Sequence, residues 1–316
     1  MRLRNALKIA IANYALVIKN LIYKLIIFAI FSLSLGLILK LALKPFVNML
    51  RPVLQSLWAL VLAIINGDNH EVAITLLKTD FNVFREYLSS NVGSLVWMVV
   101  LIILFGIIYR FLTGVSDCTL MILVNGHMTD MSHRGYMVVM IENLKKIIVY
   151  QLIDAVSSVL WSSLVCLVVW GVFRLTILVM PVAALFACAL TISVAMSFYC
   201  TVFSQVMANV LLGEHKSVKK AFLEGIVPKK SYFVKMFSAY FAVTVGLIYL
   251  HVTVSIFTFG VGELIIIPFA SLLLVTMKTV DYFTINKKKY FVDYDTIFVP
   301  KELRENDEGL LSDVDI

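Results

Sequence analysis

The stretch GSLVWMVVLIILFGIIYRFLTG, from Gly93 to Gly114, decides the fold class, because only one of its residues, Arg110, is charged. A helix of about 20 apolar residues crosses the hydrocarbon core of a bilayer, which is about 30 Å thick. The rest of the chain has the same character: 61% of its 316 residues are hydrophobic and 15% are charged. An average soluble domain has about 45–50% apolar and about 25% charged residues. We therefore predict an all-α polytopic membrane protein.

Six segments have the length and hydropathy of transmembrane helices. They cover approximately residues 22–43, 93–114, 149–172, 177–199, 236–258 and 262–283. A seventh segment, residues 53–65, would be only roughly 20 Å long as a helix, which is too short to cross comfortably. We interpret it as re-entrant or interfacial, within an outer excursion over residues 45–92. The second half of this excursion is predicted to be an amphipathic helix, with one apolar face formed by Leu77, Phe81, Phe84 and Leu88.

The positions of Lys and Arg predict the orientation. With six spans, all but six of the 27 Lys and Arg lie on the side of the two termini. The positive-inside rule makes this side the cytoplasm. Counting residues 53–65 as a span would move the basic stretches around Lys145 and in 216–235 to the outside. The net charge of +7 comes largely from the Lys and Arg that set this orientation, and these residues would contact anionic lipid headgroups at the inner leaflet. We therefore expect no nucleic-acid partner.

The loops suggest an internal repeat. SDCTLMILVNGH, from Ser116 to His127, matches SQVMANVLLGEH, from Ser204 to His215, and a basic amphipathic stretch and a new span follow each. The N-terminus offers a third such stretch. Apolar spacings of 3, 4 and 7 with flanking positive charge are typical of helices in the headgroup plane. The predicted apolar faces are Leu3, Ala6, Leu7, Ala10, Tyr14 and Val17; Met137, Met140, Ile141, Leu144 and Ile148; and Val218, Phe222 and Ile226.

The predicted unit is therefore an interfacial amphipathic helix followed by a transmembrane hairpin, three times over. This order of elements, the turn LLGEHKSVKKAF and the last span GVGELIIIPFASLLLVTMKTVDYF together resemble the membrane domain of bacterial glycerophosphodiester phosphodiesterases and related six-span families. The resemblance covers roughly residues 1–290. It implies a six-span fold in a bacterial plasma membrane. It carries over no catalytic residue, because the soluble catalytic barrel of those enzymes has no counterpart in the 33 residues after Phe283.

His127, Asp130 and His133 form a weak candidate metal cluster. Steps of three residues would place these side chains along one side of a helical turn, and imidazole with carboxylate suits zinc or iron. A fourth ligand is missing, and the matching turn of the repeat keeps His215 without equivalents of Asp130 or His133. We therefore favour a polar turn and expect no metal or other cofactor.

Three ionisable residues within the spans, Arg110, Asp154 and His251, are candidate functional positions, because charge in a membrane is costly. We expect Arg110 and Asp154 to pair between helices, either to orient these helices or to line a pathway. His251 lies nearest the midplane, where it is either satisfied by a neighbouring hydroxyl or carbonyl or part of a relay.

Other polar and helix-breaking residues leave alternatives open. The hydroxyls of Ser157, Ser158, Ser162 and Ser163 either support helix packing or line a cavity. Pro181 and Pro268 are expected to kink the fourth and sixth spans. Residues 291–316 are expected to form an acidic, partly disordered cytoplasmic tail, either merely solvated or docking a protein partner.

Two functions remain open, and we favour the first, because the chain has more interfacial amphipathic helix than recognisable chemistry. The first is a non-catalytic envelope protein that acts through lipid contact or as an assembly partner. The second is a transporter or channel for a small or lipidic solute, which would use the serine face, Asp154 and His251. An intramembrane enzyme has the least support, since the chain has no H-E-x-x-H or G-x-S-x-G motif. A water-filled cavity reaching Asp154 or His251 would favour the second function, and a tightly packed interior would favour the first.

Overall fold

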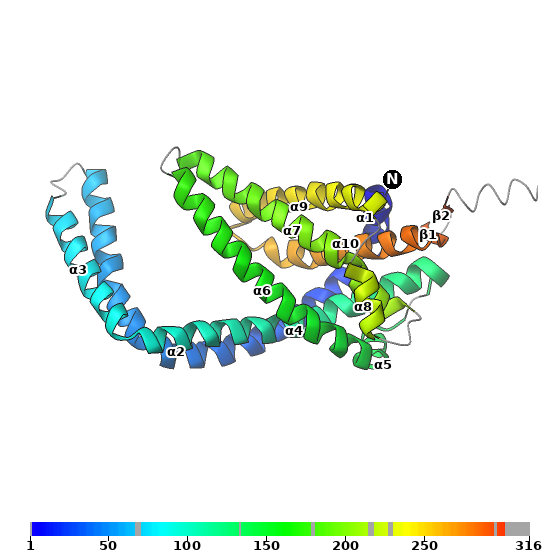
Figure 1. Cartoon of the computed structure of the whole chain (residues 1–316), viewed down its shortest axis with the longest axis horizontal. Helices are drawn as coiled ribbons and strands as arrows, with labels where there is room; N and C mark the ends of the chain where they lie inside the picture. Colours follow the sequence, from blue (N-terminus) through cyan, green and yellow to red (C-terminus); the bar gives the residue numbers. More distant parts are fainter. Residues whose placement is uncertain are drawn as a thin grey trace, which may run out of the picture. The chain divides into compact units, whose positions relative to one another are not determined.

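The structure, a computed structural model, describes residues 2–66, 71–132, 134–177, 181–213, 218–226, 230–293 and 296–300. Within these residues, short helices stand between long ones or pairs of long ones, and a small β-hairpin follows them (Figure 1). The helices are α1 (Arg2–Ala12), α2 (Ala15–Asn66), α3 (Glu71–Ser90), α4 (Val92–Asp130), α5 (Tyr136–Glu142), α6 (Leu144–Ile177), α7 (Pro181–Leu212), α8 (Val218–Ile226), α9 (Lys230–Thr258) and α10 (Glu263–Ile285). The strands are β1 (Tyr290–Asp293) and β2 (Thr296–Phe298).

The predicted class of helical membrane protein agrees with this architecture. Seven helical segments of the described chain are long and apolar enough to cross a membrane. One of them, Phe46–Ala63, contains most of the segment judged too short from the sequence, because the helix extends beyond it. Both Phe46–Ala63 and Ala15–Ser34 belong to the single helix α2, so the chain does not reverse direction between them. The count of six spans therefore stays a prediction.

Contacts divide the chain into two compact units, and the boundaries fall within α2 and α4. One unit consists of Ile27–Tyr109, and the other of the residues up to Ile26 and from Arg110 onward. The candidate site lies entirely in the second unit, which we call the main bundle.

In the unit Ile27–Tyr109, α2 packs against both α3 and α4. The ring of Phe31 lies 5.5 Å from that of Phe105, between centroids, and Phe46 lies 5.4 Å from Phe84. The predicted amphipathic helix is present as α3. Three of its four predicted apolar residues are half-buried, but Phe81 is 54% exposed. Figure 1 shows α2 as a bent helix.

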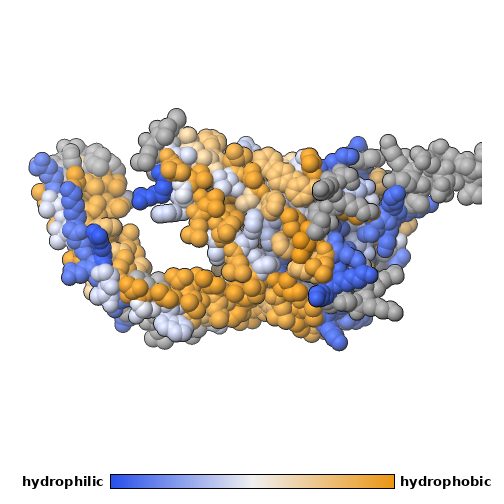
Figure 2. All heavy atoms as spheres, in the orientation of Figure 1, coloured by the Kyte–Doolittle hydropathy of each residue, from blue (hydrophilic) through white to orange (hydrophobic). Residues whose placement is uncertain are grey.

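In the main bundle, α6 pairs with α7, and α7 also packs against α8, α9 and α10. The long helices expose large apolar side chains, including Leu167 and Phe186. Figure 2 shows hydrophobic atoms over these helices and hydrophilic atoms gathered at the end that carries α5, α8 and β1. An exposed apolar belt with one polar end is the pattern of a protein surface embedded in lipid.

The second half of α4 forms the centre of this core. The sequence predicted that the span ends at residue 114 and that a connection follows, but the helix continues to Asp130. Cys118, Leu120, Met121 and Val124 are completely buried. Cys118, Met121 and Val124 are three residues apart, and Leu120 and Val124 four apart, so they share the inward face of the helix over about two turns. The stretch first seen as a loop repeat is therefore a core helix over Ser116–His127.

The three short helices differ in how they use their apolar faces. On α1, Ala6 and Ala10 are buried against α10 and β1, rather than free to contact lipid, while Tyr14 is exposed. On α5, by contrast, the predicted face is exposed over Met137 and Ile141. On α8, Ala221 is buried, and a Cβ atom added at Gly225 would lie 2.6 Å from Cα of Val206 in α7. Glycine is thus required for the close approach of α8 to α7.

The two prolines predicted to kink helices differ in their positions, and a β-hairpin follows the last helix. Pro268 lies inside α10 as expected, but Pro181 is the first residue of α7 and kinks no helix, since proline fits the first helical turn. After α10, β1 pairs antiparallel with β2. The hydroxyl of Tyr290 in β1 accepts a hydrogen bond from the side chain of Asn5 at 2.9 Å. The part of the tail predicted to be disordered, from Lys301, lies outside the described residues.

Candidate functional site

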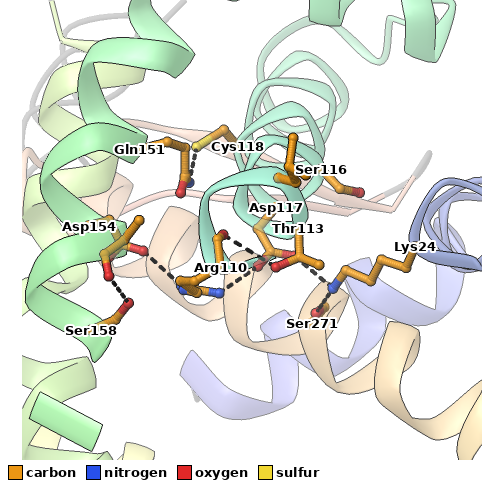
Figure 3. Close-up of polar contacts among 12 residues, drawn as sticks. Lys24, Arg110, Thr113, Ser116, Asp117, Cys118, Gln151, Asp154, Ser158 and Ser271 are labelled. Atoms are coloured by element: carbon orange, nitrogen blue, oxygen red, sulfur yellow. Dashed lines mark hydrogen bonds and ion pairs between the residues drawn. The ribbon is translucent and has the colours of Figure 1, made fainter. Parts of the chain in front are cut away.

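The centre of the site is a chain of alternating charges. Nη2 of Arg110 in α4 lies 2.8 Å from Oδ2 of Asp154 in α6, so the ion pair expected from the sequence is present (Figure 3). Nη1 of Arg110 lies 3.4 Å from Oδ2 of Asp117, seven residues further along α4. Asp117 also accepts a hydrogen bond at 3.0 Å from Nζ of Lys24 in α2. The network therefore ties three helices together.

The sequence did not predict the part of the network around Asp117. This carboxylate lies just beyond the predicted span 93–114, but its side chain is only 15% exposed. Lys24 was expected to lie at the start of a span, yet its ammonium group points inward and also donates to Ser271 of α10 at 2.5 Å. The partners are distant in sequence, and a Lys near a helix end usually reaches for water. The sequence therefore carried no signal for their contact.

Asp154 has a buried environment that stabilises its charge. Its Oδ1 accepts hydrogen bonds from the hydroxyls of Tyr150 at 3.1 Å and Tyr199 at 3.2 Å. Its side chain is 4% exposed. Burying a carboxylate costs several kcal/mol unless a counter-ion and hydrogen bonds replace the lost water. Arg110 and the two phenols do so here, which fixes the positions of α4, α6 and α7 around one point.

A cavity of about 480 Å³ opens beside this network, within the main bundle. On α10 its wall runs from Ile267 to Lys278, a length of roughly 16 Å along a helix. One part of the wall is polar and another is apolar. The polar lining includes Arg110, Asp117, Gln151, Ser158, Ser162, His251 and Lys278, and the apolar lining includes Val159, Trp161, Met196, Ile267, Ala270 and Leu274.

The serine face of α6 divides between the two roles left open by the sequence. Ser158 and Ser162 line the cavity. The hydroxyl of Ser157 lies 3.4 Å from that of Tyr199. Ser163 is exposed and donates to a carbonyl of its own helix. Two of the four hydroxyls thus belong to the cavity wall.

His251 lies in the wall of the same cavity, on α9. Its Nδ1 is 2.5 Å from Oε2 of Glu263 at the start of α10. Oε1 of Glu263 accepts a hydrogen bond from Ser255 at 2.6 Å. The expected partner of His251 was a hydroxyl or a carbonyl, and the observed partner is a carboxylate at the very start of the predicted span 262–283. The sequence missed this contact because it placed the two residues at different depths.

Two buried polar atoms in the cavity wall lack partners among the described residues. Nε1 of Trp161 is a donor and Oε1 of Gln151 is an acceptor. The amide nitrogen of Gln151 donates to the thiol of Cys118 at 3.0 Å. Gly114 makes room for this amide, since a Cβ atom there would lie 2.1 Å from Oε1. Buried polar atoms without partners are rare in proteins, and each calls for an explanation.

A second buried network joins the helices beside the site. Asn20 of α2 is completely buried, and its side chain donates to the carbonyl of Pro268 at 3.3 Å. Ser116 donates to Asn20 at 2.6 Å, and its hydroxyl lies 2.5 Å from that of Tyr136 in α5. Burial raises the pKa of Tyr136, so this phenol stays protonated at neutral pH. These hydrogen bonds connect α2, α4, α5 and α10 at one buried point.

The candidate metal cluster is not assembled in the described part of the chain. His127 is buried near the end of α4, whereas Asp130 is exposed. His133 lies outside the described residues. Among the residues that are described, no group of three or more His, Cys, Asp or Glu is placed to hold a metal ion.

No family model, curated protein or solved structure matches the chain. The resemblance to the membrane domain of glycerophosphodiester phosphodiesterases therefore rests on the sequence features alone.

Proposed function

We propose that the protein is a non-catalytic integral membrane protein that binds a small or lipidic solute in its cavity, as the binding step of a transporter or channel. The observation that carries this proposal is the cavity, because its wall contains both His251 and Arg110, the counter-ion of Asp154. Of the two functions left open by the sequence, only the second requires such a space. Small-molecule sites are typically apolar clefts with a few fixed polar groups.

The shape of the wall favours an amphiphilic solute. Its charged groups gather around Arg110, Asp117 and Lys278, while Met196 and Ile267 contribute apolar surface. A lipid or another amphiphile would place its polar end among the charges and its hydrocarbon part along the apolar wall. A fully polar solute would leave the apolar part of the wall without apolar contacts.

The setting we propose is the plasma membrane of a bacterium, with both termini in the cytoplasm. The clustering of Lys and Arg in the connections supports this orientation. The order of elements, in which α1, α5 and α8 each precede long helices, supports a threefold repeat. The basic residues of α1 and α8, and those that flank α5, would contact anionic headgroups at the inner leaflet.

A role in lipid contact or assembly is the second candidate, and the surface of α5 favours it. Met137 and Ile141 of α5 are exposed at helical spacing, and Leu144 at the start of α6 is exposed beside them. Such a face would insert into the headgroup region or cover a membrane or cytoplasmic protein partner. The two functions are compatible, since a solute-binding protein also needs anchoring.

The proposal is tested with a substitution that fills the cavity. Ala270 lies in its wall on α10 and is 8% exposed, so Ala270→Trp fills the space. Leu264→Trp, at an exposed position of the same helix, is the matched control. The full chain is purified in mild detergent and retained amphiphiles are measured by native mass spectrometry. We expect the wild type and the control to retain amphiphiles and Ala270→Trp to lose them.

A second filling variant, Ser158→Trp on α6, shows whether a loss of amphiphile comes from the filled cavity or from local misfolding at Ala270. Only variants that elute as a single species and melt cooperatively are scored. If both filling variants retain as much amphiphile as the wild type, the cavity is not the binding site and the proposal is wrong.

A further inference from the structure

Lys278 differs from the other cations of the site. Lys24 and Arg110 are each held by Asp117, and Arg110 also by Asp154. Lys278 lines the cavity on α10 and is half-buried, but no described residue forms a hydrogen bond or ion pair with it. A cation inside a membrane bundle is costly, so one without a partner marks a functional position.

The charges beside the cavity do not balance. Lys24, Arg110 and Lys278 contribute three positive charges, and Asp117 and Asp154 two negative ones. Asp117 and Asp154 form their close contacts with Lys24 and Arg110, so Asp117 attracts Lys278 without forming an ion pair with it. The buried carboxylate of Asp281, three residues along α10, interacts with Tyr240. In a space of low dielectric constant, the charge of Lys278 attracts an anion strongly.

We infer that the Lys278 end of the cavity binds the phosphate group of an anionic lipid. This inference rests on the proposed function and names its substrate class. Lys is a frequent phosphate ligand, and the N–H groups of Arg110 not used on Asp117 and Asp154 supply further donors. A phosphate offers several acceptor oxygens and can accept from both side chains at once.

Length and wall chemistry assign this phosphate to a lipid rather than to a free ion. The wall continues roughly 16 Å along α10, through Leu274 and Ala270 to Ile267. Acyl chains match this apolar surface, whereas inorganic phosphate would leave it empty. The two unpartnered atoms fit the same ligand: Oε1 of Gln151 accepts from a headgroup hydroxyl, and Nε1 of Trp161 donates to an ester carbonyl.

The depth of Lys278 also suits a headgroup. It lies seven residues before the end of α10 at Ile285, which is roughly 10 Å along the helix. A lipid from the adjacent leaflet would therefore carry its phosphate only a short way inward to reach the ammonium group.

The experiment titrates the full-length protein in detergent with three probes: dioctanoyl phosphatidic acid, dioctanoylglycerol and inorganic phosphate. Native mass spectrometry gives the apparent Kd for each. Lys278→Gln is compared with Lys145→Gln, whose lysine is exposed at the start of α6. We expect Lys278→Gln to weaken binding of phosphatidic acid by about tenfold or more, as for a charged hydrogen bond, and to leave dioctanoylglycerol unaffected. Lys145→Gln should change neither, and Lys278→Arg should retain most of the affinity.

The other outcomes separate the two proposals. Equal losses for both lipids, or no loss with phosphatidic acid, overturn the phosphate site but leave the cavity as a lipid site. Lysine-dependent binding of inorganic phosphate as tight as that of phosphatidic acid overturns the assignment to a lipid. If the wild type binds neither lipid, the proposed function itself fails.

Discussion

At the scale of single residues, Asp154 is a test of the buried network, because it contacts Arg110, Tyr150 and Tyr199. Replacing it by Asn removes the charge that balances Arg110 at 2.8 Å and leaves the two phenols a weaker acceptor. Breaking a buried pair from one side costs about 3–5 kcal/mol. We expect Asp154→Asn to lower the free energy of unfolding by about 3 kcal/mol, at the lower end because Arg110 keeps Asp117 and is partly exposed.

Thermal unfolding in detergent measures this loss, with Glu142→Gln as the control. Glu142 pairs with Arg134 at 2.7 Å, but both side chains are about half exposed. A pair of this kind contributes under about 1 kcal/mol. Equal melting temperatures for Asp154→Asn and Glu142→Gln would show that the network of Arg110 is not a structural centre.

Lys278 is expected to behave in the opposite way. Because no described residue forms a hydrogen bond or ion pair with Lys278, its removal eliminates a desolvation cost and loses only the longer-range attraction to Asp117. Without lipid, Lys278→Gln should therefore melt at or above the temperature of the wild type. A clear loss of stability in this variant would mean that Lys278 has a structural role in the free protein.

The sequence indicated some of these residues and not others, for a physical reason. Arg110 and Asp154 were evident because each interrupts an apolar run. Lys24 and Lys278 lie nearer to span ends, where a lysine normally reaches the headgroups. Only the packing of helices far apart in the sequence turns these two inward, and no local pattern records that packing.

At the scale of helices, a substitution at Gly225 tests how closely α8 packs against α7. A Cβ atom there would lie 2.6 Å from a backbone atom of Val206, which cannot move aside. Gly225→Ala should therefore destabilise the protein by about 1–3 kcal/mol through overpacking, despite the higher helix propensity of alanine. Gly171→Ala in α6 meets nothing within 4 Å and should instead be neutral or stabilising by up to about 1 kcal/mol.

Melting temperatures of the two alanine variants decide this point. If Gly225→Ala is as stable as Gly171→Ala, then α8 does not pack closely on α7. The sequence could place helices at α1, α5 and α8, because apolar spacing is local information. It could not show that α1 turns its apolar face toward α10 while α5 exposes its own, since that depends on which surfaces the long helices leave free.

At the scale of the whole molecule, the predicted number of membrane-spanning segments, six, is still to be tested. This number is measured with three single-cysteine variants, Lys8→Cys, Lys78→Cys and Lys145→Cys, in a cysteine-free background. Each is labelled with a thiol reagent that does not cross membranes. With six spans, residues 8 and 145 label from the same side and residue 78 from the other. If Phe46–Ala63 crosses separately, residues 8 and 78 share a side and residue 145 is opposite.

The helical membrane class followed from the sequence because hydropathy and length are properties of each segment alone. The cavity did not follow, because its wall combines residues from five helices that are adjacent only after folding. Ser158 and His251 could be named as polar positions, but the space between them could not be anticipated.

The accessibility of Ser158 tests the central claim, a solute-accessible cavity among the membrane helices, most directly. Ser158→Cys is compared with Leu167→Cys, at a position of the same helix that is 70% exposed on the apolar surface. Both are made in a chain lacking Cys118, Cys166, Cys188 and Cys200, and reacted with a water-soluble methanethiosulfonate in liposomes. A thiol reacts as its thiolate, which forms where water reaches it, so we expect position 158 to react about tenfold or more faster. Equal, slow labelling at the two positions would contradict the account.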